Sequence, residues 1–172
     1  RRDATVERLD AEALLPAIFF IFSRAGCDAA VGQLMHSGIR LTNASERREL
    51  EQIAAEHTEG LSPSDLDALD YGHFLDAFRH GIAAHHAGLL PAFKEAVEEA
   101  FVRGLVKVVF ATETLALGIN MPARSVVLER LVKYNGESHA PITPGEYTQL
   151  TGRAGRRGID VEGHAVVLWQ TG

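Results

Sequence analysis

Short runs of apolar residues alternate along the chain with longer stretches in which apolar residues recur every three or four positions. The first run, residues 16–22, is wholly apolar and rich in aromatic and β-branched side chains. An uninterrupted run of this kind is typical of a strand buried on both faces. Similar runs predict further strands at residues 81–85, 105–111, 125–129 and 162–169.

Two of the intervening stretches carry apolar residues at positions i, i+3, i+4, i+7 and i+8, one beginning at Cys27 and the other at Phe93. This spacing predicts a helix with one buried face in each stretch. Gly38 is expected to end the first helix, and Pro91 to begin the second. Strands that alternate with such helices predict an α/β fold, with a parallel sheet and helices on both of its faces.

Residues 43–80 depart from this pattern. They contain nine acidic and three basic residues, and three short helices are expected near Ser45, Ser62 and Tyr71. We therefore interpret the chain, residues 1–172, as a single domain with an acidic helical insertion at 43–80. A solvated appendage is the first interpretation of this insertion, and a protein-docking face is the alternative.

The composition excludes several classes of protein. No run of eighteen apolar residues is present to span a membrane, and residues 1–10 are too polar for a signal peptide. The missing initiator Met suggests a piece of a longer chain. The single cysteine, Cys27, excludes an internal disulfide and favours a reducing, cytoplasmic location. His85 and His86 are adjacent on a strand and lack a cysteine pair, so no metal site is expected.

The net charge of −6 argues against a generally basic nucleic-acid-binding protein. All of this charge lies in the acidic insertion, however, because the rest of the chain holds equal numbers of acidic and basic residues. A body that is neutral overall can still hold a local site for phosphate.

The strongest chemical signal is Q-L-T-G-R-A-G-R-R-G at residues 149–158, which sets Arg153, Arg156 and Arg157 among three glycines. A guanidinium group is charged at any working pH and presents a planar fork that matches phosphate oxygens. Arg153 and Arg156 are three residues apart, so on a helical turn both side chains project from one side. The pattern favours a phosphate clamp or an arginine finger. The alternative is a solvated basic loop that touches nucleic acid loosely.

Three loops, at residues 23–26, 85–88 and 112–120, each follow a predicted strand. Ligands of parallel sheets bind outside the carboxyl ends of the strands, so these loops are expected to share one edge. The chain contains neither a Gly-Lys pair nor an Asp-Glu pair, so it lacks a phosphate-binding loop and the usual acidic motif for Mg²⁺. We therefore expect a half-site that another domain completes.

Four stretches carry a family resemblance: F-F-I-F-S-R-A-G-C-D, A-A-H-H-A-G-L-L-P, V-V-F-A-T-E-T-L-A-L-G-I-N-M-P-A and Q-L-T-G-R-A-G-R-R-G. Together they resemble the C-terminal RecA-like lobe of a superfamily-2 helicase. The resemblance is to the DExH RNA helicases of the superkiller and exosome-cofactor type, and among them to the actinobacterial HelY-type group. It covers nearly all of the chain and implies a RecA-like parallel sheet.

The resemblance implies a nucleotide site shared between two lobes. Arg153 and Arg156 match the catalytic arginines that reach the γ-phosphate of ATP across the cleft between lobes. Gln149, Gly118 and Asn120 match residues near the nucleotide. ATP with Mg²⁺ would be held mainly by the N-terminal RecA-like lobe of the same polypeptide. The isolated chain is accordingly expected neither to hydrolyse ATP nor to unwind duplexes.

The resemblance also implies contacts with the backbone of a nucleic acid. The residues that match this strand path are Ser23, Arg24, Gly26, His86, Gly88 and Thr112. The expected partner is single-stranded RNA, and no membrane is expected. A DNA helicase or translocase of the same superfamily is one alternative, because backbone contacts do not separate RNA from DNA. A non-enzymatic nucleic-acid-binding module is another, and only such a module would tolerate lysine in place of Arg153 and Arg156.

Overall fold

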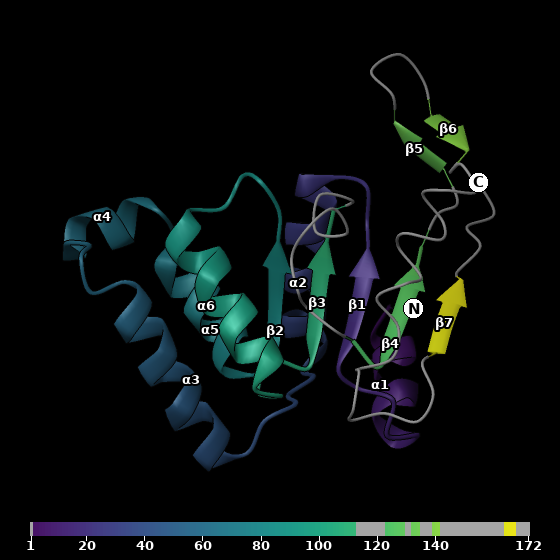
Figure 1. Cartoon of the computed structure of the whole chain (residues 1–172), viewed down its shortest axis with the longest axis horizontal. Coiled ribbons are helices and arrows are strands. Elements are labelled where there is room, and N and C mark those ends of the chain that lie inside the picture. Colours follow the sequence, from purple (N-terminus) through teal and green to yellow (C-terminus); the bar gives the residue numbers. More distant parts are fainter. Residues whose placement is uncertain (1, 113–122, 130–131, 135–138, 142–163, 168–172) are drawn as a thin grey trace.

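A computed structural model of the chain describes residues 2–112, 123–129, 132–134, 139–141 and 164–167. These residues form a five-stranded sheet in which all neighbouring strands are parallel, in the order β2-β3-β1-β4-β7 (Figure 1). The strands are β1 (Ala17–Phe20), β2 (Ile82–His85), β3 (Val108–Ala111), β4 (Ser125–Leu128) and β7 (His164–Val167). The predicted α/β fold with a parallel sheet is confirmed.

Every residue of the central strand β1 is buried, and its side chains alternate between two cores. Ile18 and Phe20 belong to one core. Ala17 and Phe19 belong to the other, where the rings of Phe19 and Phe110 have their centroids 5.1 Å apart. Because both faces of the strand are covered, none of its positions has to be polar.

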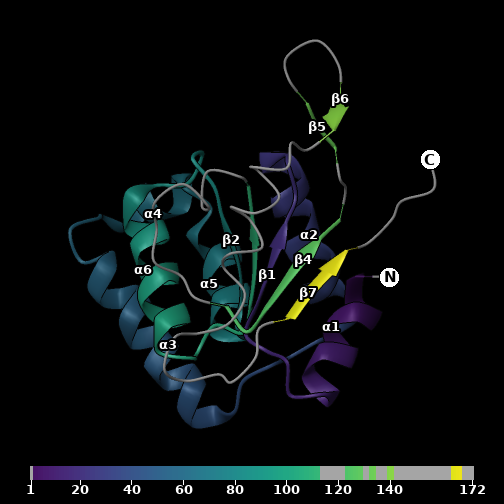
Figure 2. The same ribbon diagram turned by 45° about the vertical axis from the view of Figure 1, so that its right-hand side comes forward.

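Helices cover both faces of the sheet (Figure 2). α1 (Arg2–Ala11) and α2 (Arg24–Ser37) pack on one face, and α3 (Ala44–His57) and α6 (Pro91–Val102) pack on the other. The two helices predicted from apolar spacing are therefore confirmed as α2 and α6. Gly38 ends α2 with a φ of 87°, a left-handed conformation that glycine adopts without steric cost.

The acidic segment 43–80 consists of α3, α4 (Pro63–Ala68) and α5 (Tyr71–Arg79). Asn43 caps α3, because its side chain accepts a hydrogen bond from the Glu46 N–H and the Glu46 carboxylate accepts one from the Asn43 N–H. This reciprocal pair begins the helix at residue 44, before the Ser45 that the sequence pattern favoured.

The interpretation of this segment as a solvated appendage is wrong. Leu50, Ile53 and Ala54 of α3 are buried in the core. α5 lies along the edge strand β2 and contributes Ala77 to one core and Phe78 to the other. None of the nine acidic residues in this fully described segment is buried. The charge therefore belongs to the outer sides of helices whose inner sides complete the core.

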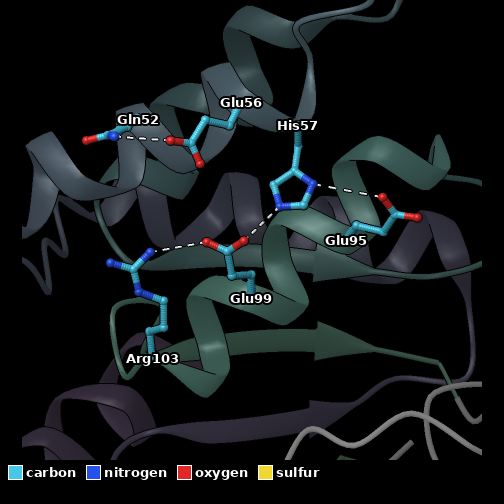
Figure 3. Close-up of polar contacts among 6 residues, drawn as sticks. All are labelled: Gln52, Glu56, His57, Glu95, Glu99 and Arg103. Carbon is cyan, nitrogen blue, oxygen red and sulfur yellow. Dashed lines mark hydrogen bonds and ion pairs between the residues drawn. The ribbon is translucent and has the colours of Figure 1, made fainter.

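Polar contacts also join α3 to α6 (Figure 3). The Nε2 atom of His57 on α3 lies 3.1 Å from Glu99 Oε1 on α6. At the end of α6, Arg103 Nη1 donates a hydrogen bond of 3.1 Å to Glu99 Oε2, and Arg103 Nη2 lies 3.6 Å from Glu49 Oε1 on α3. The hydrogen bond with His57 is the main cause of a lowered pKa for Glu99, and Arg103 acts in the same direction. Exposed contacts of this kind add little free energy each, but together they fix how α3 lies against α6.

A second, smaller sheet lies at residues 132–134 and 139–141, where the apolar pattern predicted no strand. β5 (Val132–Tyr134) pairs antiparallel with β6 (His139–Pro141) to form a two-stranded sheet. Strands this short are determined by their pairing partner more than by their own sequence pattern. No helix in the described part of the chain is long and apolar enough to cross a membrane.

The role of α3 in the core is testable with two substitutions in that helix. Ile53→Ala should lower the free energy of unfolding by about 2–5 kcal/mol, because it leaves a cavity beneath α3. The exposed Arg48→Ala should change it by no more than about 0.5 kcal/mol. Urea unfolding followed by circular dichroism measures both, and equal effects would show that α3 does not belong to the core.

Candidate nucleic-acid interface

The chain turns from β1 into α2 at Ser23, where the first group of predicted site residues lies. The Ser23 hydroxyl oxygen accepts a hydrogen bond of 3.0 Å from the Gly26 N–H and so caps the helix. A Cβ on residue 26 would lie only 2.9 Å from Ile21 Cγ2, so this turn requires glycine. Ser23 and Arg24 are both exposed. The turn therefore presents a helix N-terminus and a guanidinium group to solvent, a combination that attracts anions.

The loop after β2 is tied to α2 through a buried imidazole. His86 is 5% exposed, and its Nδ1 atom accepts a hydrogen bond of 3.1 Å from the Gly88 N–H. Nε2 must then carry the proton of the neutral ring, and it donates to Asp28 Oδ1 over 2.8 Å. A Cβ on Gly88 would lie 3.4 Å from Arg24 Cδ. The loops after β1 and β2 therefore lie side by side.

The carboxyl end of β3 lies between those of β2 and β1. Ala111, the last residue of β3, is in register with His85 of β2 and with Phe20 of β1. Its carbonyl accepts a hydrogen bond of 2.9 Å from the Ile21 N–H. The next residue, Thr112, is buried and lies at the same edge.

The structure thus brings six of the predicted site residues to the carboxyl edge of the sheet. They are Ser23, Arg24, Gly26, His86, Gly88 and Thr112. The other five lie outside the described residues, so their placement stays a prediction. They are Gly118, Asn120, Gln149, Arg153 and Arg156.

The adjacent residues His85 and His86 contact helices on opposite faces of the sheet. Whereas His86 contacts α2, His85 Nε2 lies 2.8 Å from Glu98 Oε1 on α6. Burial lowers the pKa of His85, and the hydrogen bond with Glu98 opposes this effect only in part. His85 is therefore a neutral core residue at neutral pH. Among the described residues, no group of three His, Cys, Asp or Glu side chains is arranged to hold a metal ion.

Two buried groups beside this edge have structural roles. Cys27 packs in the core below α2, and burial, followed by the nearby Asp28 and Glu129, raises the pKa of its thiol to about 12. The thiol is therefore protonated and acts as a small core side chain, as predicted. Glu129, directly after β4, is buried and paired with Arg2 Nε at 2.7 Å.

Sequence reasoning missed Asp28, the residue that positions His86. It lies 58 residues from its partner, and an acidic residue on the outer side of a helix carries no signal of such a contact. Only the parallel order of β2, β3 and β1 brings the two residues to the same edge.

Comparison with known proteins identifies the family to which this domain belongs. Residues 38–158, more than half of the chain, match the family described as the helicase conserved C-terminal domain. The chain belongs to this helicase family. A RecA-like parallel sheet whose loops converge at the carboxyl edge agrees with that membership.

Three relatives show which groups of helicases this C-terminal domain resembles. It is 64% identical, over 98% of its length, to the probable helicase HelY of Mycobacterium tuberculosis, of which it covers 18%. It is 48% identical, over 95% of its length, to the chloroplastic DExH-box ATP-dependent RNA helicase DExH15 of Arabidopsis thaliana, of which it covers 13%. Identity to Superkiller complex protein 2 of Mus musculus is 43%, over 93% of this chain and 13% of that protein.

These relatives confirm the resemblance to superkiller-type and HelY-type helicases that the sequence motifs indicated. The chain spans less than a fifth of the length of each of the three. The described helicase domain is thus comparable with one part of each relative.

Two glycines of α2 provide a matched test of the turn at Ser23. Gly32→Ala should raise the free energy of unfolding by about 0.5–1 kcal/mol, because a Cβ there meets nothing within 4 Å and alanine favours the helix. Gly26→Ala should instead lower it by about 1–3 kcal/mol, because Ile21 must move. Chemical unfolding measures both values. A gain from Gly26→Ala like that from Gly32→Ala would show that the turn does not need glycine.

The buried imidazole of His85 predicts a dependence of stability on pH. Its pKa is lowered in the folded state from an ordinary value of 6.5, so the unfolded chain takes up the proton first as the pH falls. Its contribution to stability is therefore complete above pH 6.5 and is lost below that pH. In thermal melts from about pH 7.5 to about pH 5.5, His85→Gln should show a smaller drop in Tm than the parent. The exposed His36→Gln is the control and should follow the parent.

Proposed function

We propose that this helicase C-terminal domain is the second motor lobe of an ATP-dependent RNA helicase. It grips single-stranded RNA along the carboxyl edge of its sheet. It supplies Arg153 and Arg156 to ATP and Mg²⁺ bound by a first RecA-like lobe of the same polypeptide. The observation that carries the proposal is the hydrogen bond between His86 and Asp28, which joins the loop after β2 to the helix after β1.

The carboxyl edge offers the groups that a phosphodiester backbone requires. α2 begins there with its N–H groups, Arg24 is exposed beside them, and Gly88 is exposed in the neighbouring loop. Contacts of this kind do not depend on base identity, which suits a motor that moves along any sequence. RNA is favoured as the substrate because the relative DExH15 is named an RNA helicase.

The assignment of Arg153 and Arg156 to hydrolysis has a separate physical basis. A guanidinium group supplied from another lobe stabilises the charge on a transferring phosphoryl group, and in GTPases it accelerates hydrolysis on the order of 10³–10⁵-fold. The chain contains no Gly-Lys pair and so no phosphate-binding loop of its own. Closure of two lobes on ATP and their reopening after hydrolysis would move the bound RNA.

Two arginine substitutions are expected to separate hydrolysis from RNA binding. In a polypeptide that joins this chain to a first RecA-like lobe, Arg156→Ala should lower RNA-stimulated ATP hydrolysis on the order of 10³-fold. Its affinity for RNA should not change, because only a γ-phosphate contact is removed. Arg24→Ala should weaken binding equally for all RNA sequences and reduce the salt dependence by about one phosphate contact. Steady-state ATPase assays and fluorescence titrations with single-stranded RNA measure these effects.

The matched control is Arg48→Ala on the outer side of α3, which should change neither property. Unchanged hydrolysis in the Arg156→Ala protein would contradict the role given to that residue. ATP turnover by the 172-residue chain alone would contradict the need for a first lobe. Equal stimulation by single-stranded DNA would instead assign the chain to a DNA helicase or translocase.

A further inference from the structure

A groove opens between α2 and α5, beside the edge strand β2 and next to the loop that follows it. Its volume is about 500 Å³, within the range of sites that bind small molecules or peptide side chains. Its apolar lining includes Val31, Met35, Phe74, Ala77, Leu89 and Phe93. Of its lining residues, Asp28 alone has a part in the interface described above, through its hydrogen bond with His86.

Two stacked aromatic rings form part of the apolar wall of the groove. Phe74 and Phe93 stack with their ring centroids 4.6 Å apart and their planes 12° from parallel. Leu69 lies at the rim and is 40% exposed, one of only two large apolar side chains exposed in the described part of the chain. An apolar wall with an exposed apolar rim is suited to receive the side chain of a partner.

The rim of the groove is acidic. Asp28, Asp70 and Asp76 line it, and no lysine or arginine does so among the described lining residues. His73 is the one other titratable group there, and its Nδ1 atom lies 2.6 Å from Asp70 Oδ1. The surrounding segment 43–80 carries the whole net charge of the chain. A phosphate backbone is repelled by such a rim, whereas a cationic chain is attracted.

We propose that this groove binds a basic, amphipathic peptide segment of a partner protein. An aliphatic or aromatic side chain of the segment packs against Phe74 and Phe93, and its lysines or arginines pair with the aspartates of the rim. Charge complementarity selects this occupant over nucleic acid, and the apolar wall selects an amphipathic segment over a merely basic one. The groove thus gives the acidic insertion the docking role that its composition left open.

Gly32 allows the groove to be filled without disturbing the fold. It lies on α2, lines the groove, and would carry a Cβ that meets nothing within 4 Å. A leucine at this position would therefore project into space that the proposed peptide occupies. Gly72 on α5 also has open space around its Cβ but does not line the groove, so Gly72→Leu is a matched control.

The test uses fluorescein-labelled helical peptides of about twelve residues, built from lysine with Leu, Met or Phe anchors at i, i+3 and i+7. Fluorescence polarisation with the protein should give saturable binding on the order of 10–100 μM for at least one peptide. Gly32→Leu should weaken it about tenfold or more, and Gly72→Leu should leave it unchanged. Asp70→Asn combined with Asp76→Asn should weaken binding and reduce its dependence on salt.

Several outcomes would overturn the proposal. They are failure of all three peptides to saturate, equal binding by peptides with glutamate in place of lysine, and equal binding by the Gly32→Leu protein. Displacement of the peptide by single-stranded RNA would assign the groove to nucleic acid instead. Thermal melts verify that Gly32→Leu folds. The peptide titrations contain no ATP, and RNA is added only in the displacement experiment, so the measured peptide affinity is independent of the proposed helicase function.

Discussion

The burial of β1 on both faces is the constraint on which the rest of this structure depends. A strand with no exposed face must be paired on both edges and covered by helices on both sides. Parallel neighbours meet that requirement only through crossover connections, and these return the chain to the same end of the sheet each time. The loops after β1, β2 and β3 therefore gather at one edge as a consequence of how the core is built.

At that edge, hydrogen bonds among Gly88, His86 and Asp28 fix the position of the loop after β2 relative to α2. The Gly88 N–H donates a hydrogen bond to Nδ1 of His86, so Nε2 carries the ring proton and donates to Asp28. The ring is 5% exposed, so water does not compete effectively for either bond. The loop after β2 is thereby held against α2 by a residue that itself need not touch a ligand. Arg24 and Gly88 remain exposed at this edge.

Much of the fold follows from local patterns, and the errors have identifiable causes. The apolar run of β1 and the spacing from Cys27 and Phe93 predicted elements that the structure contains, because burial imposes a period on the sequence. The insertion was misjudged from its charge, although the spacing of Leu50, Ile53 and Ala54 in α3 already indicated an apolar side. A count of acidic residues averages over both sides of a helix, whereas packing depends on only one.

For the candidate site too, features set by nearby residues were predicted, whereas contacts between distant residues were not. The six described site residues were expected at one edge because each lies in a loop that follows a strand of the predicted parallel sheet. The contact between His86 and Asp28 joins residues 58 positions apart, and neither the spacing nor the residue types predict it. The pairing of β5 with β6 likewise depends on two short strands finding each other. Such contacts are properties of the assembled fold and leave little trace in any one segment.

The position of α5 has a consequence for the behaviour of the chain in solution. Among the described strands, β2 pairs with β3 alone, and the unpaired main-chain groups of an edge strand recruit strands from other molecules. α5 lies along this edge, and the acidic residues of the segment 43–80, none of which is buried, add mutual repulsion between molecules. A lobe trimmed of residues 43–80 would expose a bare apolar strand and be prone to aggregation. The acidic segment therefore cannot be removed to obtain a minimal helicase C-terminal domain.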